Sequence, residues 1–183
     1  MVWVWAFLFQ AALAPMPPSS LAETEAMRRA RSVRESSAAA PQGWLTRAES
    51  SDFLETGSYE ECVQFYRRLA AASRSARLEE IGRSSEGRPL YALIVSRDRA
   101  FTPAAARRTG KPVVLLQNGI HAGENGGKDA AMMLLRDLLV TRRLEQLLDS
   151  VIVLSIPVFN ADGHERVSPW NRINENGPRE MGF

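Results

Sequence analysis

The sequence predicts an α/β fold with an open, mixed but mostly parallel sheet and helices on both of its faces. Three apolar runs, at residues 90–96, 112–118 and 151–158, predict the strands of this sheet. A segment of helix-forming residues at 128–139 separates the last two runs. Strands that alternate with helices in this way are typical of sheets covered by helices. We therefore expect one α/β domain over residues 50–183.

The domain is predicted to begin with a helix at residues 59–69. Apolar side chains from Cys62 to Leu69 recur every three or four positions, which is the helical period. Ser58, followed three residues later by Glu61, is a capping-box signature for the start of this helix. Cys62 is the one cysteine of the chain. We expect it in the core, because it has no disulfide partner and no neighbouring base to activate it.

The remaining elements follow from local pattern. Residues 81–90 contain Gly-x-Ser-x-x-Gly-Arg and lead directly into the first of the three strands. The run 113–117 is almost continuously apolar, as in strands that are buried on both faces. The helix at 128–139 is apolar almost all round, so we expect it to be buried against the sheet. A second helical stretch, 142–148, precedes the last strand.

A histidine and a carboxylate follow the second of these strands directly. His121 and Glu124 lie three residues apart, and the residues between them, Ala122 and Gly123, are small. On a tight turn or the first turn of a helix, residues three apart project from the same side. Open α/β sheets place their chemistry beyond the carboxyl ends of strands, and a catalytic zinc binds nitrogen and carboxylate donors. We therefore expect His121 and Glu124 to be metal ligands.

Three stretches of the chain occur in the order that is typical of one enzyme family. They are the segment 81–90, whose Gly-x-Ser-x-x-Gly-Arg resembles a hairpin of that family, the segment 111–124 with its His-x-x-Glu pair, and the segment 151–163, which ends in Asn-Ala-Asp-Gly. An ordered set of motifs is far more specific than any one of them. Residues 50–183 resemble the amino-terminal part of the zinc metallocarboxypeptidase family, the carboxypeptidase A-like enzymes. The fold is accordingly expected to be a truncated form of theirs.

This resemblance implies a zinc-dependent hydrolase that releases carboxyl-terminal residues from peptides. It implies Zn²⁺ bound by His121 and Glu124, and peptide or protein carboxyl termini as partners. In the family, the third zinc ligand and the glutamate that activates the zinc-bound water come after the Asn-x-Asp-Gly turn, and neither has a counterpart here. We therefore expect a fragment that is itself inactive. The family also uses an arginine from this part of the chain to stabilise the oxyanion, a role that the resemblance gives to Arg172.

Two positions depart from the family pattern. Asn125, Gly126 and Gly127 follow Glu124 where the family has an apolar residue that packs the helix start. Glycine loses more backbone entropy on ordering, so this helix start is expected to be looser. Ala161 replaces the usual proline of the turn, while the Asp-Gly pair after it keeps the turn chemistry.

His164 is the only other histidine and therefore the alternative candidate for the missing ligand. It follows Gly163, where a turn ordinarily directs a side chain to solvent or to the rim of the sheet. A histidine in a loop is the favoured interpretation, and a zinc ligand is the alternative.

Composition and the amino terminus indicate class and location. The chain has 183 residues, of which 45% are hydrophobic and 24% charged, as in an ordinary globular protein. Its net charge of +2 is too small to indicate a nucleic-acid partner. The apolar block at 2–14 is shorter than the roughly 20 residues that span a bilayer, so we expect no stable membrane span. We interpret residues 1–22 as a signal peptide and 23–49 as a linker or pro-region, which predicts a secreted or periplasmic protein.

Two other functions stay open. Zinc-dependent deacylases of N-acyl amino acids share the fold and also begin their site with His-x-x-Glu, although the Gly-x-Ser-x-x-Gly-Arg hairpin favours the peptidase. The missing ligand and base favour a non-catalytic remnant or binding module, because two ligands bind zinc weakly.

Overall fold

The computed structural model describes residues 25–173 and 175–183. The chain divides into two compact units, residues 1–34 and 35–183. The predicted signal peptide, residues 1–22, lies outside the described residues. No helix among the residues that are described is long and apolar enough to cross a membrane.

The order of helices and strands is close to the predicted one. In chain order the elements are α1 (Glu25–Ala39), α2 (Arg47–Ser50), α3 (Tyr59–Ala72), β1 (Ala76–Arg83), β2 (Pro89–Val95), α4 (Pro103–Thr109), β3 (Val113–Gln117), α5 (Gly126–Leu139), the 3₁₀ helix η1 (Glu145–Asp149), β4 (Ile152–Ile156) and α6 (Ala161–His164). Helices α1, α2, α4 and α6 have no counterpart among the predicted elements. For α4 a recognised start signal was present, because Thr102 caps this helix and Pro103 opens it. The capping box of Ser58 and Glu61 at the start of α3 is confirmed.

The four strands form one mixed sheet in the order β1-β2-β4-β3. The pairs β1–β2 and β2–β4 are antiparallel, and the pair β3–β4 is parallel. The prediction of a mostly parallel sheet is therefore wrong for the described residues. The turn at residues 84–88 reverses the chain between β1 and β2, whereas the crossover through α5 makes β4 parallel to β3.

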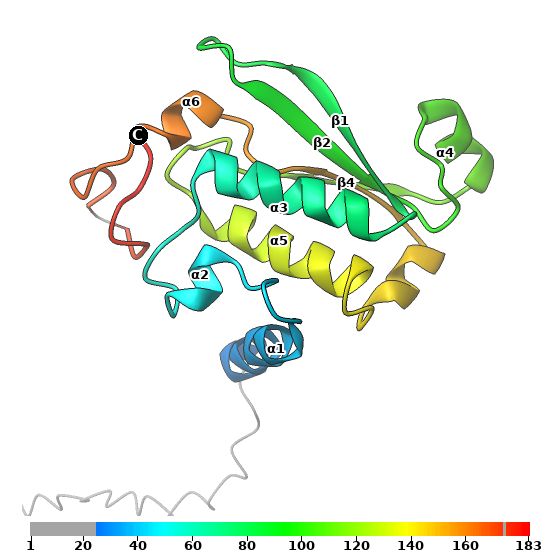
Figure 1. Ribbon diagram of the computed structural model, residues 1–183, viewed down its shortest axis with the longest axis horizontal. Coiled ribbons are helices and arrows are strands. Elements are labelled where there is room, and N and C mark those ends of the chain that lie inside the picture. Colours follow the sequence, from blue (N-terminus) through cyan, green and yellow to red (C-terminus); the bar gives the residue numbers. More distant parts are fainter. Residues whose placement is uncertain (1–24, 174) are drawn as a thin grey trace, which may run out of the picture. The chain divides into compact units, whose positions relative to one another are not determined.

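Helices α3 and α5 lie side by side across one face of the sheet (Figure 1). Their apolar sides pack with Leu93, Val95 and Val153 of the strands to form the main core. Tyr66 of α3 is fully buried and shares a hydrogen bond of 2.8 Å with Ser155 of β4. Cys62 is buried in the same core, as expected, and burial raises the pKa of its thiol to about 12. The thiol is therefore not a nucleophile at neutral pH.

The edge of the sheet at β3 is open to solvent. β3 pairs with β4 alone. Val113 and Leu115 are 52% and 51% exposed, although the apolar run predicted a strand buried on both faces. The difference arises because the described residues leave this part of the sheet uncovered. Helices were expected on both faces of the sheet. Among the described residues, α3 and α5 cover one face.

A buried arginine joins the residues before α3 to the domain. Arg136 of α5 is fully buried, and its guanidinium pairs with Glu49 at 2.7 Å. The same guanidinium donates to the backbone oxygens of Ser36 and Trp44. Residues 36–49 are thus bound to the domain. The interpretation of 23–49 as a linker or pro-region stays a prediction.

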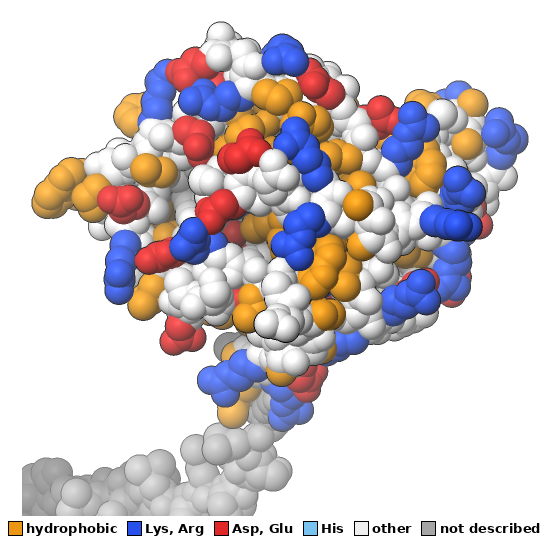
Figure 2. All heavy atoms as spheres, in the orientation of Figure 1, with side chains coloured by type: hydrophobic (Ala, Val, Ile, Leu, Met, Phe, Trp, Pro, Cys, Tyr) orange, Lys and Arg blue, Asp and Glu red, His pale blue; other side chains and the backbone are white. Residues whose placement is uncertain are grey.

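The face shown in Figure 2 carries charges of both signs. Lys and Arg side chains are interspersed there with Asp and Glu, and hydrophobic side chains lie between them. Opposite charges pair within α3, as Arg67 does with Glu60, and between α2 and α3, as Arg47 does with Glu61. Neither sign of charge dominates this face.

Candidate metal centre

The two parallel strands end at the same edge of the sheet, and the loops that follow them are joined by hydrogen bonds. Asn118, just after β3, accepts a bond of 2.8 Å from the backbone N–H of Phe159, just after β4. The N–H of Asn160 donates to the carbonyl of Gly119, also at 2.8 Å. Gly119 has φ +61°, and a Cβ there would lie 3.2 Å from a methyl of Val158, so glycine suits this close approach. The loop that carries the predicted ligands is thus held against the turn after β4.

His121 and Glu124 face one another, as their spacing predicts. The imidazole Nδ1 lies 2.9 Å from Oε1 of Glu124 and donates to it. A backbone turn supports the pair, because the N–H of Glu124 donates to the carbonyl of His121 at 3.0 Å. Both side chains are well exposed, at 68% and 53%. Their donor atoms therefore converge at a position that solvent can reach.

The pair fits part of a zinc site. Two atoms bound tetrahedrally to zinc at about 2.0–2.1 Å lie roughly 3.3 Å apart, close to the observed separation of Nδ1 and Oε1. The proton between these atoms is the one that a metal would displace. Within the described residues, no group of three or more His, Cys, Asp or Glu side chains is placed to bind a metal. The structure therefore presents two ligands in a fitting arrangement.

Arg172 reaches the same pair from a distant part of the chain. Its Nη2 donates to Oε1 of Glu124 at 3.0 Å and also pairs with Glu175. The hydrogen bond that Arg172 donates to Glu175 raises the pKa of the guanidinium, which stays charged. The structure thus brings together the three residues, His121, Glu124 and Arg172, that the sequence predicted as site residues.

The Gly-x-Ser-x-x-Gly-Arg hairpin has a structural role that the sequence did not predict. Ser84 Oγ and Arg88 Nη1 each donate to Oδ1 of Asp162 at 2.7 Å, and the backbone N–H of Glu86 donates to Oδ2 at 3.0 Å. Desolvation opposes ionisation of Asp162, but the bonds from Ser84 and Arg88 outweigh it and lower the pKa of this carboxyl. The hairpin therefore clamps the turn after β4.

The Asn-x-Asp-Gly turn also packs against the loop that carries His121 and Glu124. Asn160 caps α6, because its side-chain oxygen accepts from the N–H of Gly163 at 3.0 Å. A Cβ on Gly163 would lie 2.9 Å from the Cβ of Ala122, which is too close for any side chain. Hairpin, turn and ligand loop therefore form one contiguous support for His121.

His164 is not the third ligand. It is only 3% exposed. Lys128 Nζ donates to its Nε2 at 3.1 Å, and its Nδ1 donates to Glu165 at 2.9 Å, so both ring nitrogens are engaged. Lys128 also donates to the carbonyl of Gly57. The expectation that this side chain points to solvent or the sheet rim is wrong, because α6 turns it inward toward α5.

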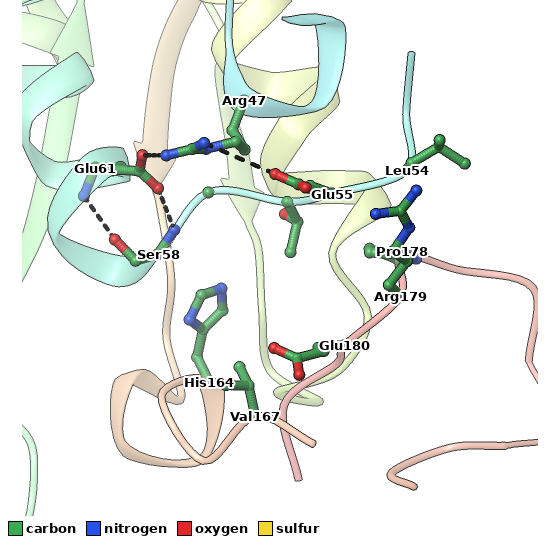
Figure 3. A pocket seen from close by; sticks show the side chains of 12 residues that line it. Arg47, Leu54, Glu55, Ser58, Glu61, His164, Val167, Pro178, Arg179 and Glu180 are labelled. Carbon is green, nitrogen blue, oxygen red and sulfur yellow. Dashed lines mark hydrogen bonds and ion pairs between the residues drawn. The ribbon is translucent and has the colours of Figure 1, made fainter. Parts of the chain in front are cut away.

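A separate cavity of about 380 Å³ lies beside His164 (Figure 3). Its wall includes Arg47, which pairs with both Glu55 and Glu61. His121, Glu124 and Arg172 do not line it. Arg47, Glu55 and Glu61 of this wall are thus already paired with each other. The cavity is distinct from the site of His121 and Glu124.

Most of this domain is similar to known proteins. Residues 62–181 match the family model described as zinc carboxypeptidase. Carboxypeptidase D of Mus musculus is 32% identical to this chain over an alignment that covers 56% of the chain and 8% of that protein. Residues 62–181, which match the family model, contain His121, Glu124 and Arg172.

Two solved structures share the fold. The carboxypeptidase A from Helicoverpa armigera has a TM-score of 0.55 and 25% identity, over 75% of this chain and 33% of that one. Thrombin-activatable fibrinolysis inhibitor has a TM-score of 0.54 at 21% identity, over 76% of this chain and 34% of that one, which is a likeness of fold. The chain therefore spans about a third of the length of these structures. The family model matches most of the domain, from α3 to the isolated bridge at Met181. The chain therefore belongs to the zinc carboxypeptidase family.

Proposed function

We propose that this chain contributes the first two ligands and the oxyanion-binding arginine of a zinc-dependent metallocarboxypeptidase, which hydrolyses carboxyl-terminal residues from peptides. The observation that carries the proposal is the convergence of His121 Nδ1 and Arg172 Nη2 on Oε1 of Glu124, at 2.9 and 3.0 Å. A nitrogen donor, a carboxylate and a fixed cation in one place are part of what zinc-assisted peptide hydrolysis requires.

Each residue has a distinct role in this proposal. His121 and Glu124 would hold the zinc ion, which supplies a Lewis acid and lowers the pKa of bound water. Arg172 would donate to the oxygen that gains negative charge when the peptide carbonyl is attacked. The third ligand and the general base would come from outside the described residues. The proposed partners are peptide or protein carboxyl termini, and the proposed location is secreted or periplasmic.

A non-catalytic form is the second candidate for the 183-residue chain. It is favoured by one observation, that two ligands converge where a catalytic zinc needs three. Two ligands bind the metal weakly, and without the general base a bound metal should turn over little substrate. This candidate predicts no peptidase activity for the chain itself.

Metal content and hydrolysis together test the proposal. The purified chain, its His121→Ala variant and the full-length gene product are dialysed, and zinc per chain is measured by elemental analysis. Glu80→Gln, on the distant strand β1, is the control. We expect one zinc per full-length protein and its loss in His121→Ala. Zinc retention that does not depend on His121 would contradict the proposal.

The substrate class is tested with the same full-length protein. Peptides with free carboxyl termini are offered in parallel with N-acyl amino acids, with and without a chelator. Chelator-sensitive release of carboxyl-terminal residues supports the peptidase. Hydrolysis of N-acyl amino acids alone would replace it with the deacylase.

A further inference from the structure

We propose that Gly123 is a positioning residue of this site: because it has no side chain, the side chain of Arg172 can cross the ligand loop and reach Glu124. The inference rests on the proposed function, since it concerns the same His121 and Glu124 pair. On this inference, Gly123 determines whether the Arg172 guanidinium contacts the metal ligand Glu124.

Space, rather than backbone conformation, requires glycine at this position. A Cβ on Gly123 would lie 2.1 Å from Cδ and 3.1 Å from Nε of Arg172. It would also lie 2.8 Å from the carbonyl oxygen of Gly182. Gly123 is not among the glycines with positive φ. Any side chain here would therefore occupy the volume that the Arg172 side chain now fills.

A second close backbone contact lies next to Gly123, at Gly182. A Cβ on Gly182 would lie 2.8 Å from the carbonyl oxygens of both Ala122 and Gly163. The N–H of Phe183 donates to the carbonyl of Gly163 at 3.0 Å. The backbone of residues 182–183 is thus packed against the ligand loop next to Gly123, so a side chain at position 123 would meet both this backbone and Arg172.

Arg172 is held in this position by its charged end. Its side chain is only 25% exposed, and its Nε is buried without a hydrogen-bond partner. The backbone at Arg172 has φ +52°, a conformation that L residues seldom adopt. A buried unpaired donor and an unfavourable φ both cost free energy. The ion pairs of Nη2 with Glu124 and Glu175 offset that cost, so the placement depends on Arg172 reaching Glu124.

The consequence concerns the charge at the metal ligand. Arg172 and a bound Zn²⁺ both draw on the lone pairs of Glu124, and two cations at short range repel. A side chain at position 123 would displace the Arg172 guanidinium and leave the Glu124 carboxylate without this cation. We therefore expect Gly123→Ala to mimic removal of Arg172 at the metal site.

The position of Arg172 can be measured without metal or substrate. In the metal-free chain, the buried Nε–H of Arg172 should exchange slowly with solvent, and ¹H–¹⁵N spectra of the arginine Nε region detect it. Arg172→Ala assigns the resonance by its loss. Gly123→Ala should remove the slow exchange. Gly126→Ala is the matched control, because a Cβ at Gly126 meets nothing within 4 Å. Slow exchange that survives in Gly123→Ala would overturn the proposal.

A double-mutant cycle supplies the second readout. Zn²⁺ dissociation constants are measured by calorimetry for the chain, Gly123→Ala, Arg172→Ala and the double variant. We expect each single change to tighten Zn²⁺ binding about twofold to fivefold, the range of an exposed ion pair, and the two effects not to add. Additive effects would overturn the proposal. In thermal melts, Gly123→Ala should lower the melting temperature less in the Arg172→Ala background than in the parent chain. An equal decrease in the two backgrounds would also overturn the proposal.

Failure of the proposed function gives a different result. If His121→Ala binds Zn²⁺ as the parent chain does, the zinc site is wrong, whatever the exchange of the Arg172 Nε–H. If His121→Ala loses Zn²⁺ but Gly123→Ala leaves both Arg172 and Zn²⁺ binding unchanged, the zinc site stands and the role of Gly123 is wrong.

Discussion

Ser84 Oγ donates a hydrogen bond of 2.7 Å to Oδ1 of Asp162, joining the hairpin between β1 and β2 to the turn after β4. The two residues are 78 positions apart in the chain. Arg88 donates to the same oxygen, so the carboxylate is fixed from two directions. This contact explains why serine and arginine occupy fixed places in the hairpin pattern. It also supports the loop that presents His121, since the Asp162 turn packs on Ala122 through Gly163.

Ser84→Ala should destabilise the chain by about 1 kcal/mol, because Asp162 loses a charge-assisted donor. Unfolding in urea, followed by circular dichroism, measures the change. Ser85→Ala, at the next position of the same turn, is the control and should change stability by less than about 0.5 kcal/mol. Equal losses in the two variants would show that the bond to Asp162 contributes nothing specific.

Glu49→Gln should cost much more, about 3 kcal/mol or above, because it leaves the buried Arg136 guanidinium without its carboxylate. The matched control is Glu60→Gln, whose exposed partner Arg67 lies 3.6 Å away. Exposed pairs contribute little, so the control should lose under about 0.5 kcal/mol. Both values come from urea unfolding at neutral pH. A loss in Glu49→Gln no larger than that of the control would contradict the role of this pair in binding residues 36–49.

Stability should fall when the pH is lowered through the ordinary titration range of histidine. Burial, and next the positive charge of Lys128, lower the pKa of His164 below its usual 6.5, against the opposing effect of Glu165. The unfolded chain therefore binds this proton more readily than the folded one. The contribution is present above pH 6.5 and is lost as the pH falls from there through the folded-state pKa.

The variant His164→Gln checks this assignment. It removes the titrating group while keeping an acceptor for Lys128. Urea midpoints at pH 7.5 and pH 5.5 should differ less in His164→Gln than in the parent chain. An unchanged difference would assign the pH dependence to other groups. Asp129 is not one of them, because burial raises the pKa of its carboxyl, and such a group favours the folded chain as the pH falls.

The exposed edge strand should make this chain associate with itself. β3 presents unpaired backbone groups together with exposed Val113 and Leu115, which is a template for strand pairing. Leu115→Lys should lower the association, and light scattering over a concentration series measures it. Leu147→Lys, at a similarly exposed leucine on η1, is the control. The prediction is wrong if both lysines have the same effect.

The local pattern of the sequence determined the two main helices, α3 and α5, the strands and the candidate ligand pair. The helix of α3 follows from the capping box of Ser58 and Glu61 and from the apolar spacing after it. The contact between His121 and Glu124 was predictable because residues three apart in a turn lie on one side. Interactions over three or four residues depend on backbone geometry that short spacings specify, so pattern alone was enough for them.

Only the tertiary structure decided which distant residues meet. Arg172 lies 48 positions from Glu124, and their contact depends on the space left by Gly123 and on the path of the chain after α6. Burial of His164 depends on Lys128 arriving from α5. The antiparallel pairing of β2 with β4 and the exposure of β3 depend on strand order, which periodicity does not encode. Such contacts join residues far apart in sequence, so they are specified by the packing of the whole chain rather than by any segment of it.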